Sequence, residues 1–168
     1  MEFGLLVIRV ALGLTLAAHG AQKLFGWFGG GGVAGTGGFF EQMGFRPGKV
    51  MAVVAGLGEA LGGLGIAFGL LTPFAAALVI AVMSVAIVSV HLEKGFFTTN
   101  GGYEFPLLNA AVAFGLVFIG PGSLSFDGAL GLKLAGPDWA GVALAIGLLG
   151  AAAPLAARAA RRAHQKTA

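Results

Sequence analysis

The chain alternates between long apolar stretches and shorter polar connections. Five stretches are long enough, or nearly so, to cross a membrane: Phe3–Phe25, Val50–Leu71, Phe74–Leu92, Phe105–Gly120 and Trp139–Ala157. A spanning helix needs roughly 20 mainly apolar residues, so the fourth stretch is short, and the fifth is rich in Ala and Gly. None shows the alternation typical of membrane strands. The pattern predicts an all-α membrane protein with a four-helix transmembrane core and a fifth transmembrane helix.

The connections divide the chain further. Glycine fills much of the segment Gly26–Gly48, which we expect to be a long loop. The second connection is only "LLTP", and Pro73 predicts an abrupt antiparallel hairpin. We therefore expect a four-helix membrane domain over residues 1–127, a linker and fifth helix over 128–157, and a basic tail over 158–168.

Composition supports the membrane assignment. Of 168 residues, 57% are hydrophobic and 10% are charged, and the mean hydropathy is +0.91. Soluble domains carry about a quarter charged residues. The absence of cysteine excludes disulfides, thiolate metal sites and covalently attached haem within this chain, and we expect no metal site. Glu2 and Arg9 argue against a cleaved signal peptide at the N-terminus.

Basic residues predict the orientation. Five crossings place eight of the ten Lys and Arg residues on the side of the C-terminal tail "ARAARRAHQK", and four crossings weaken this bias. Basic loops face the cytoplasm, so we expect the N-terminus outside and the C-terminus inside. The tail is then placed to contact anionic lipid. We expect the lipid bilayer to surround the chain and no nucleic acid to bind it.

Several polar residues fall within the apolar stretches. At a rise of about 1.5 Å per residue, Lys23 and His91 lie at helix ends, Asn109 lies roughly 6 Å deep and His19 about 9 Å deep. Glu59 lies about 15 Å deep, close to the midplane. Four different helices thus direct polar groups into one half of the membrane. We expect them to surround one inward-facing polar pocket.

Glu59 is the sharpest of these signals, because a carboxylate at this depth costs several kcal/mol unless it is paired or neutral. Its neighbours Ala55, Gly56, Gly62 and Gly63 are small, so another backbone or a flat ligand can approach. Functional roles are typical of such residues. The alternative is that Glu59 only ties helices together.

Arg9, His19 and Lys23 share one face of the first helix, within an arc of about 80°. The two histidines are as consistent with an interface position as with a site, and Lys23 can simply extend its ammonium to the interface. Trp27 belongs to an aromatic group typical of membrane interfaces; stacking on a ligand ring is the other interpretation.

Five segments together resemble the DoxX family of small bacterial membrane proteins: "IRVALGLTLAAHGAQKLFGWFGG", "GFFEQMGF", "AGLGEALGGLGIAFGLLTP", "VSVHLEKGFF" and "NGGYEFPLLNAAVAF". They run in order from Leu5 to about Asp127, roughly three quarters of the chain. The resemblance implies a four-helix core in the bacterial inner membrane. It also implies Arg9, His19, Lys23, Glu59 and His91 as a shared polar set. Family members are linked to thiosulfate:quinone oxidoreduction, to complexes with oxidative-stress enzymes, and to quinone or catechol resistance.

The leading hypothesis is a quinone-interacting subunit of a membrane oxidoreductase system. His19 or Lys23 would hydrogen-bond a quinone carbonyl, with Arg9, Trp27 and Asn109 as further binding candidates, and Glu59 and His91 would relay protons. The sequence has no flavin or nucleotide motif, so a redox-enzyme partner would supply electrons. The alternatives are a non-enzymatic assembly or chaperone protein and a small-molecule transporter. Haem b between His19 and His91 is not expected, and a homo-oligomer is compatible with the glycine-rich faces.

Overall fold

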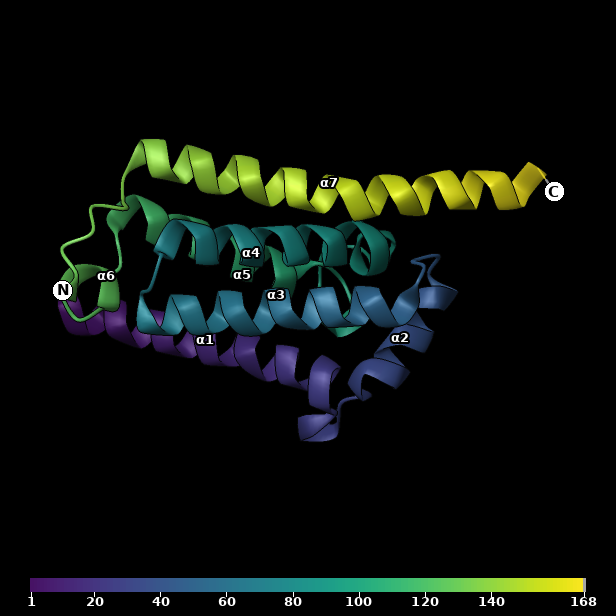
Figure 1. Cartoon of the computed structure of the whole chain (residues 1–168), viewed down its shortest axis with the longest axis horizontal. Coiled ribbons are helices and arrows are strands. Elements are labelled where there is room, and N and C mark those ends of the chain that lie inside the picture. Colours follow the sequence, from purple (N-terminus) through teal and green to yellow (C-terminus); the bar gives the residue numbers. More distant parts are fainter. Residues whose placement is uncertain (168) are drawn as a thin grey trace.

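The computed structural model describes residues 1–167, and side chains through residue 164. Five long helices lie side by side: α1 (Glu2–Phe25), α3 (Gly48–Phe68), α4 (Thr72–Ala86), α5 (Glu104–Ile119) and α7 (Pro137–Thr167) (Figure 1). The shorter elements are the 3₁₀-helix η1 (Trp27–Gly29), α2 (Gly32–Gln42), the π-helix η2 (Ile87–His91), the 3₁₀-helices η3 (Leu92–Lys94) and η4 (Thr98–Asn100), and α6 (Phe126–Ala129). Residues 1–167 contain no strand, and the predicted all-α class is confirmed.

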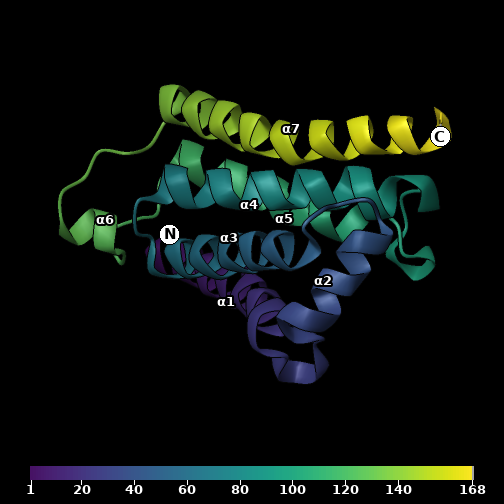
Figure 2. The ribbon, with the colours of Figure 1, turned by 45° about the vertical axis from the view of Figure 1, so that its right-hand side comes forward.

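Successive long helices run in opposite directions, so the two chain termini lie at opposite ends of the bundle (Figures 1 and 2). Four segments are long and apolar enough to cross a membrane: Glu2–Phe25, Gly48–Phe68, Thr72–Lys94 and Pro137–His164. The fourth predicted span forms α5, which has only 16 residues. We call the end that carries Met1 and the α5–α7 connection the N-terminal end. The C-terminal end carries α2, η2 and the last turns of α7.

Glycines on α3 bring two neighbouring helices into close contact. A methyl group added at Gly63 would lie 2.5 Å from the Gly13 carbonyl oxygen of α1, and one added at Gly58 would lie 2.7 Å from a Val82 methyl of α4. A methyl group at Gly62 would likewise crowd α4, and one at Gly56 would crowd the end of α1. Small residues around Glu59 therefore serve helix packing, the first of the two uses that the sequence allows.

The segment Gly26–Gly48 is not simply a loop, as the sequence analysis expected, because α2 occupies its centre. Glycine disfavours helices, so local propensity gives little sign of it. Tertiary packing explains the difference. A methyl group at Gly37 would lie 2.9 Å from the Lys49 backbone nitrogen, and one at Gly48 would meet the Gly37 carbonyl. Close packing on the start of α3 thus stabilises α2 where its own composition would not.

Candidate functional site

A cavity of about 600 Å³ lies in the C-terminal half of the bundle. Residues from α1 to α5, from η2 and from α7 line it, and most of them are apolar. Four phenylalanine side chains contribute to its wall: Phe39, Phe40, Phe45 and Phe105. The ionisable residues on the wall are His19, Lys23, Glu59 and His91. The structure thus brings together four of the seven residues that the sequence analysis selected as site candidates.

Lys23 and Glu59 form an ion pair across α1 and α3. The Lys23 ammonium donates a hydrogen bond to Glu59 Oε2 at 2.6 Å, and the side chains are 23% and 6% exposed. An ammonium has three donors and a carboxylate about four acceptor positions, so this bond leaves capacity on both groups. The pair ties two helices together and also borders the cavity. Glu59 therefore has both the interhelical contact and the cavity position that the two interpretations of the sequence describe.

His19 lies one turn before Lys23 on α1 and close enough to Glu59 to interact with it electrostatically. Its ring packs against Phe105 of α5, with 5.7 Å between ring centroids. This contact fixes one face of the imidazole against an aromatic ring, an arrangement that also contributes to stability. His19 thus joins the wall contributed by α1 to the wall contributed by α5.

His91 lies at the end of the π-helix that continues α4. Its Nδ1 atom is 2.6 Å from the carbonyl oxygen of Gly101. A carbonyl oxygen can only accept, so Nδ1 carries the proton in this bond. In the neutral ring Nε2 is then the acceptor nitrogen, the form that can take up a proton. π-Helical turns are often found at functional sites. Here the π-helix places Ser89, Val90 and His91 on the cavity wall.

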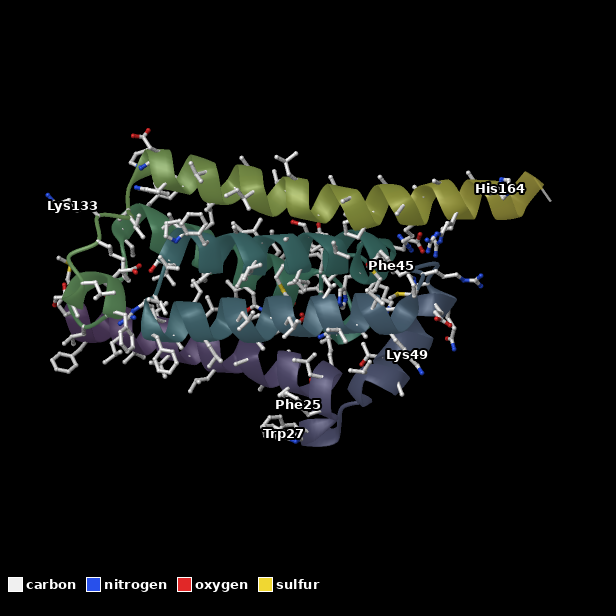
Figure 3. The ribbon with its side chains drawn as sticks, viewed as in Figure 1. Phe25, Trp27, Phe45, Lys49, Lys133 and His164 are labelled. Carbon is white, nitrogen blue, oxygen red and sulfur yellow. The ribbon has the colours of Figure 1, made fainter. Side chains whose placement is uncertain are left out.

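Arg9, Trp27 and Asn109, the other three candidates, do not line this cavity. Asn109 is buried behind it, and its side-chain nitrogen lies 4.0 Å from the sulfur of the cavity residue Met83. Trp27 is exposed below the end of α1, where its ring packs on Phe25 with a centroid distance of 5.1 Å (Figure 3). That position matches the interfacial interpretation of the aromatic group.

Arg9 instead belongs to a second polar cluster, at the N-terminal end. It is 1% exposed and donates to the carbonyl oxygens of Ala67, at 3.3 Å, and Leu124. Its Nε has no hydrogen-bond partner among the described residues. The charge of Asp127 acts favourably on the guanidinium. An apolar groove of about 510 Å³ lies next to this cluster; Ala67, Leu124 and Ser125 line it, whereas Arg9 and Asp127 do not.

Asp127 organises this cluster, and the sequence analysis did not select it. Its carboxylate accepts from the backbone N–H groups of Leu71 and Thr72, at 2.7 and 2.9 Å, and from the Thr72 hydroxyl at 2.7 Å. These bonds satisfy donors at the start of α4 that no helical carbonyl reaches. One feature of the sequence could have indicated Asp127: it is the one acidic residue in the connection between α5 and α7, which lies at the same end of the bundle as Arg9.

The basic C-terminal segment is also more than a lipid-facing tail. Arg158 Nε donates to the Met43 carbonyl at 2.9 Å, a terminal nitrogen donates to the Ser89 carbonyl at 3.3 Å, and the guanidinium lies 5.4 Å from the Phe45 ring centroid. Arg161 donates to the Arg46 carbonyl. Arg158 therefore connects α7 to two segments that line the cavity. Figure 3 shows Phe45 between α3 and α7 at this end.

The composition of the cavity wall is typical of a pocket for a small organic ligand. Within the described residues, no group of three or more His, Asp or Glu side chains is close enough to hold a metal ion. The wall instead offers the Lys23 ammonium and the Glu59 carboxylate beside aromatic rings. Pockets for small organic ligands typically combine a mainly apolar wall with a few such polar groups.

Comparison with known proteins identifies relatives. The DoxX family model matches residues 4–92. A curated protein of Bacillus subtilis (strain 168), "Putative oxidoreductase CatD", is 31% identical over 126 residues, which are 75% of this chain and 86% of that protein. An "Uncharacterized protein" of Haemophilus influenzae is 37% identical over 60 residues, 36% of this chain and 40% of its own length. No solved structure gives a significant match.

Proposed function

The chain belongs to the DoxX family, and on that premise we propose that it is a quinone-interacting membrane subunit of an oxidoreductase system. One observation carries the proposal: the partly buried Lys23–Glu59 pair borders a mainly apolar cavity of about 600 Å³. Pockets of about 300–1,000 Å³ suit small organic ligands. The printed name of the Bacillus subtilis relative supports an oxidoreductase context and says nothing of a quinone.

The wall of the cavity matches the chemistry of a quinone head in three respects. The head is flat, and four phenylalanine rings offer apolar surfaces. Its carbonyl oxygens accept hydrogen bonds, and Lys23 retains donors beyond the one bonded to Glu59. Its full reduction takes up two electrons and two protons, and Glu59 and His91 are groups that can move protons.

Roles for the individual residues follow from this placement. Lys23 would hydrogen-bond one carbonyl of the head and stabilise negative charge that develops on it. Glu59 would exchange a proton at the inner wall of the cavity. His91, with Nδ1 held by Gly101, would exchange protons through Nε2. A partner subunit would supply or remove the electrons.

The location in a membrane and the orientation of the chain rest on different observations. Multi-pass membrane insertion is supported by the family and by the four spanning helices. We further propose the bacterial inner membrane, with the C-terminus in the cytoplasm. The basic residues Arg46, Lys49 and Arg161 lie at the C-terminal end, and Lys133 lies at the opposite one (Figure 3). That separation is the one expected from the positive-inside rule.

The experiment is mass spectrometry of small molecules that co-purify with the protein from native-like membranes. We expect wild type and the control Glu2→Gln to retain a quinone, and Glu59→Gln to lose most of it. Glu2→Gln makes the same chemical change at the N-terminal end, away from the cavity. Bulk lipid alone in all three samples would overturn the proposal. Altered partner proteins in Glu59→Gln, without any quinone in wild type, would favour the assembly alternative instead.

A further inference from the structure

The residues that line the cavity fall into two groups by chemistry. Lys23 and Glu59 supply charged groups, and a second group is entirely apolar. We call the part of the cavity next to this second group the apolar arm; its residues are Val54, Leu78, Ala81, Val85, Gly150 and Pro154. The first lies on α3, the next three on α4, and the last two on α7. Within the described residues, the arm contains no ionisable side chain.

The arm follows the groove between α3 and α7, with α4 as its floor. Both ribbon views place α4 between these two helices (Figures 1 and 2). Contacts agree with this arrangement. A methyl group added at Gly150 would meet the Ala81 side chain at 3.4 Å, and one added at Gly62 would meet the Leu78 side chain at 3.1 Å. Small residues on α7 thus let this helix approach α4 and leave its Pro154 on the edge of the groove.

This arm reaches the outer surface of the bundle. Val54 and Leu78 line it and are 57% and 41% exposed. On membrane-spanning helices, exposed apolar side chains of this kind face hydrocarbon. The cavity is therefore continuous from a charged pair inside the bundle to a surface that contacts lipid. Such a shape matches an amphiphile whose polar head is inside and whose apolar chain leads back to the bilayer.

We propose that the apolar arm holds the hydrocarbon tail of the ligand, so that the site takes lipid-soluble quinones with an isoprenoid or alkyl tail and admits them sideways from the bilayer between α3 and α7. This inference rests on the proposed function and adds the tail and the entry route to it. Helix α7 supplies one wall of the tail site. This helix lies outside residues 4–92, the part of the chain that the family model matches.

Binding of two compounds to the protein in lipid nanodiscs tests the inference. One is decylubiquinone, and the other is the same dimethoxy-methyl-benzoquinone head without its tail. Val54→Trp places a bulky ring in the arm, and Leu78→Trp does so independently from α4. Leu61→Trp is the matched control, because Leu61 is also 57% exposed, lies two turns along the same face of α3, and does not line the cavity.

The expected result is selective. In Val54→Trp and Leu78→Trp, affinity for decylubiquinone falls by about tenfold or more, in keeping with the cost of overpacking. Affinity for the tail-less head stays within about twofold of wild type. Leu61→Trp binds both compounds as wild type does.

Two other outcomes are distinguishable. If wild type binds both compounds and the arm variants leave decylubiquinone binding unchanged, or weaken both compounds equally, the tail site is wrong and the proposed function stands. If wild type binds neither compound, the proposed function fails and this inference fails with it.

Discussion

Each half of the bundle holds a basic residue of α1 in contacts between helices, and the surroundings of the two residues differ. At the N-terminal end, Arg9 is 1% exposed and donates to two backbone carbonyls beside Asp127, whose carboxylate accepts three hydrogen bonds. Lys23, in the C-terminal half, makes one bond to Glu59, and both border a cavity. Charged residues between the helices of this protein therefore have two distinct uses. Those at the N-terminal end hold neighbouring segments together, and those at the cavity keep hydrogen-bonding positions free for a ligand.

The largest effect on stability should come from Asp127→Ala at the N-terminal cluster. Removal of this carboxylate leaves the donors of Leu71 and Thr72 unsatisfied and takes away the charge that faces Arg9. Each buried donor left without an acceptor costs about 1–3 kcal/mol, so the loss of three such bonds should cost several kcal/mol. Thermal unfolding in mild detergent measures the change. An unfolding midpoint equal to that of wild type would contradict a stabilising role for this cluster.

Glu59→Gln should cost less stability, no more than about 1–2 kcal/mol, although Glu59 is nearly as buried as Asp127, at 5% against 1% exposed. The reason is the cavity: Lys23 is 23% exposed and can be hydrated when its partner is neutral. The same unfolding assay compares the two variants directly. A loss as large as that of Asp127→Ala would make Glu59 a structural residue first and weaken the distinction between the two ends.

Arg158→Gln should loosen the C-terminal end by about 1 kcal/mol, because it removes two hydrogen bonds to backbone carbonyls and the contact with the Phe45 ring. Hydrogen exchange at the amides of Met43, Gly44 and Phe45, which donate backbone hydrogen bonds, should accelerate by about fivefold. Arg162→Gln, which removes the same charge one turn further along α7, is the control. Equal exchange in both variants would show that net charge, and not the bonds of Arg158, holds the segment.

The smallest effect is expected for Phe105→Leu. This change keeps an apolar side chain on the cavity wall and removes the ring contact with His19. Aromatic pairs contribute about 0.5–1.5 kcal/mol, and we expect the lower limit here. Because the wall stays apolar, quinone retention should fall only slightly. A complete loss of retention would mean that the Phe105 ring itself holds the ligand head.

Much of the fold was predictable because apolar length and helix-ending residues are local signals. All five predicted stretches form helices, and Pro73 lies at the start of α4 as expected. Two features were not predictable in this way. The glycine-rich α2 packs against the start of α3, a contact that its own composition does not reveal. The π-helix that ends at His91 follows no pattern that the sequence analysis used.

For the site, helix periodicity and depth were informative but incomplete. They placed His19, Lys23 and Glu59 in the same half of the membrane, and the structure brings all three to one cavity. Periodicity also grouped Arg9 with them, since all lie on one face of α1. Fourteen residues separate Arg9 from Lys23, about 21 Å along a helix, so a shared face does not imply a shared site. Asp127 and Arg158 act through loop and interhelical contacts that no periodicity reveals.

A crystal structure of the protein with bound decylubiquinone would test the central claim most directly. The account predicts the quinone head inside the cavity, with a carbonyl oxygen within hydrogen-bonding distance of Lys23 or Glu59, about 3 Å. A head bound elsewhere on the surface, with the Lys23–Glu59 pair unchanged and an acyl chain filling the cavity, would contradict it.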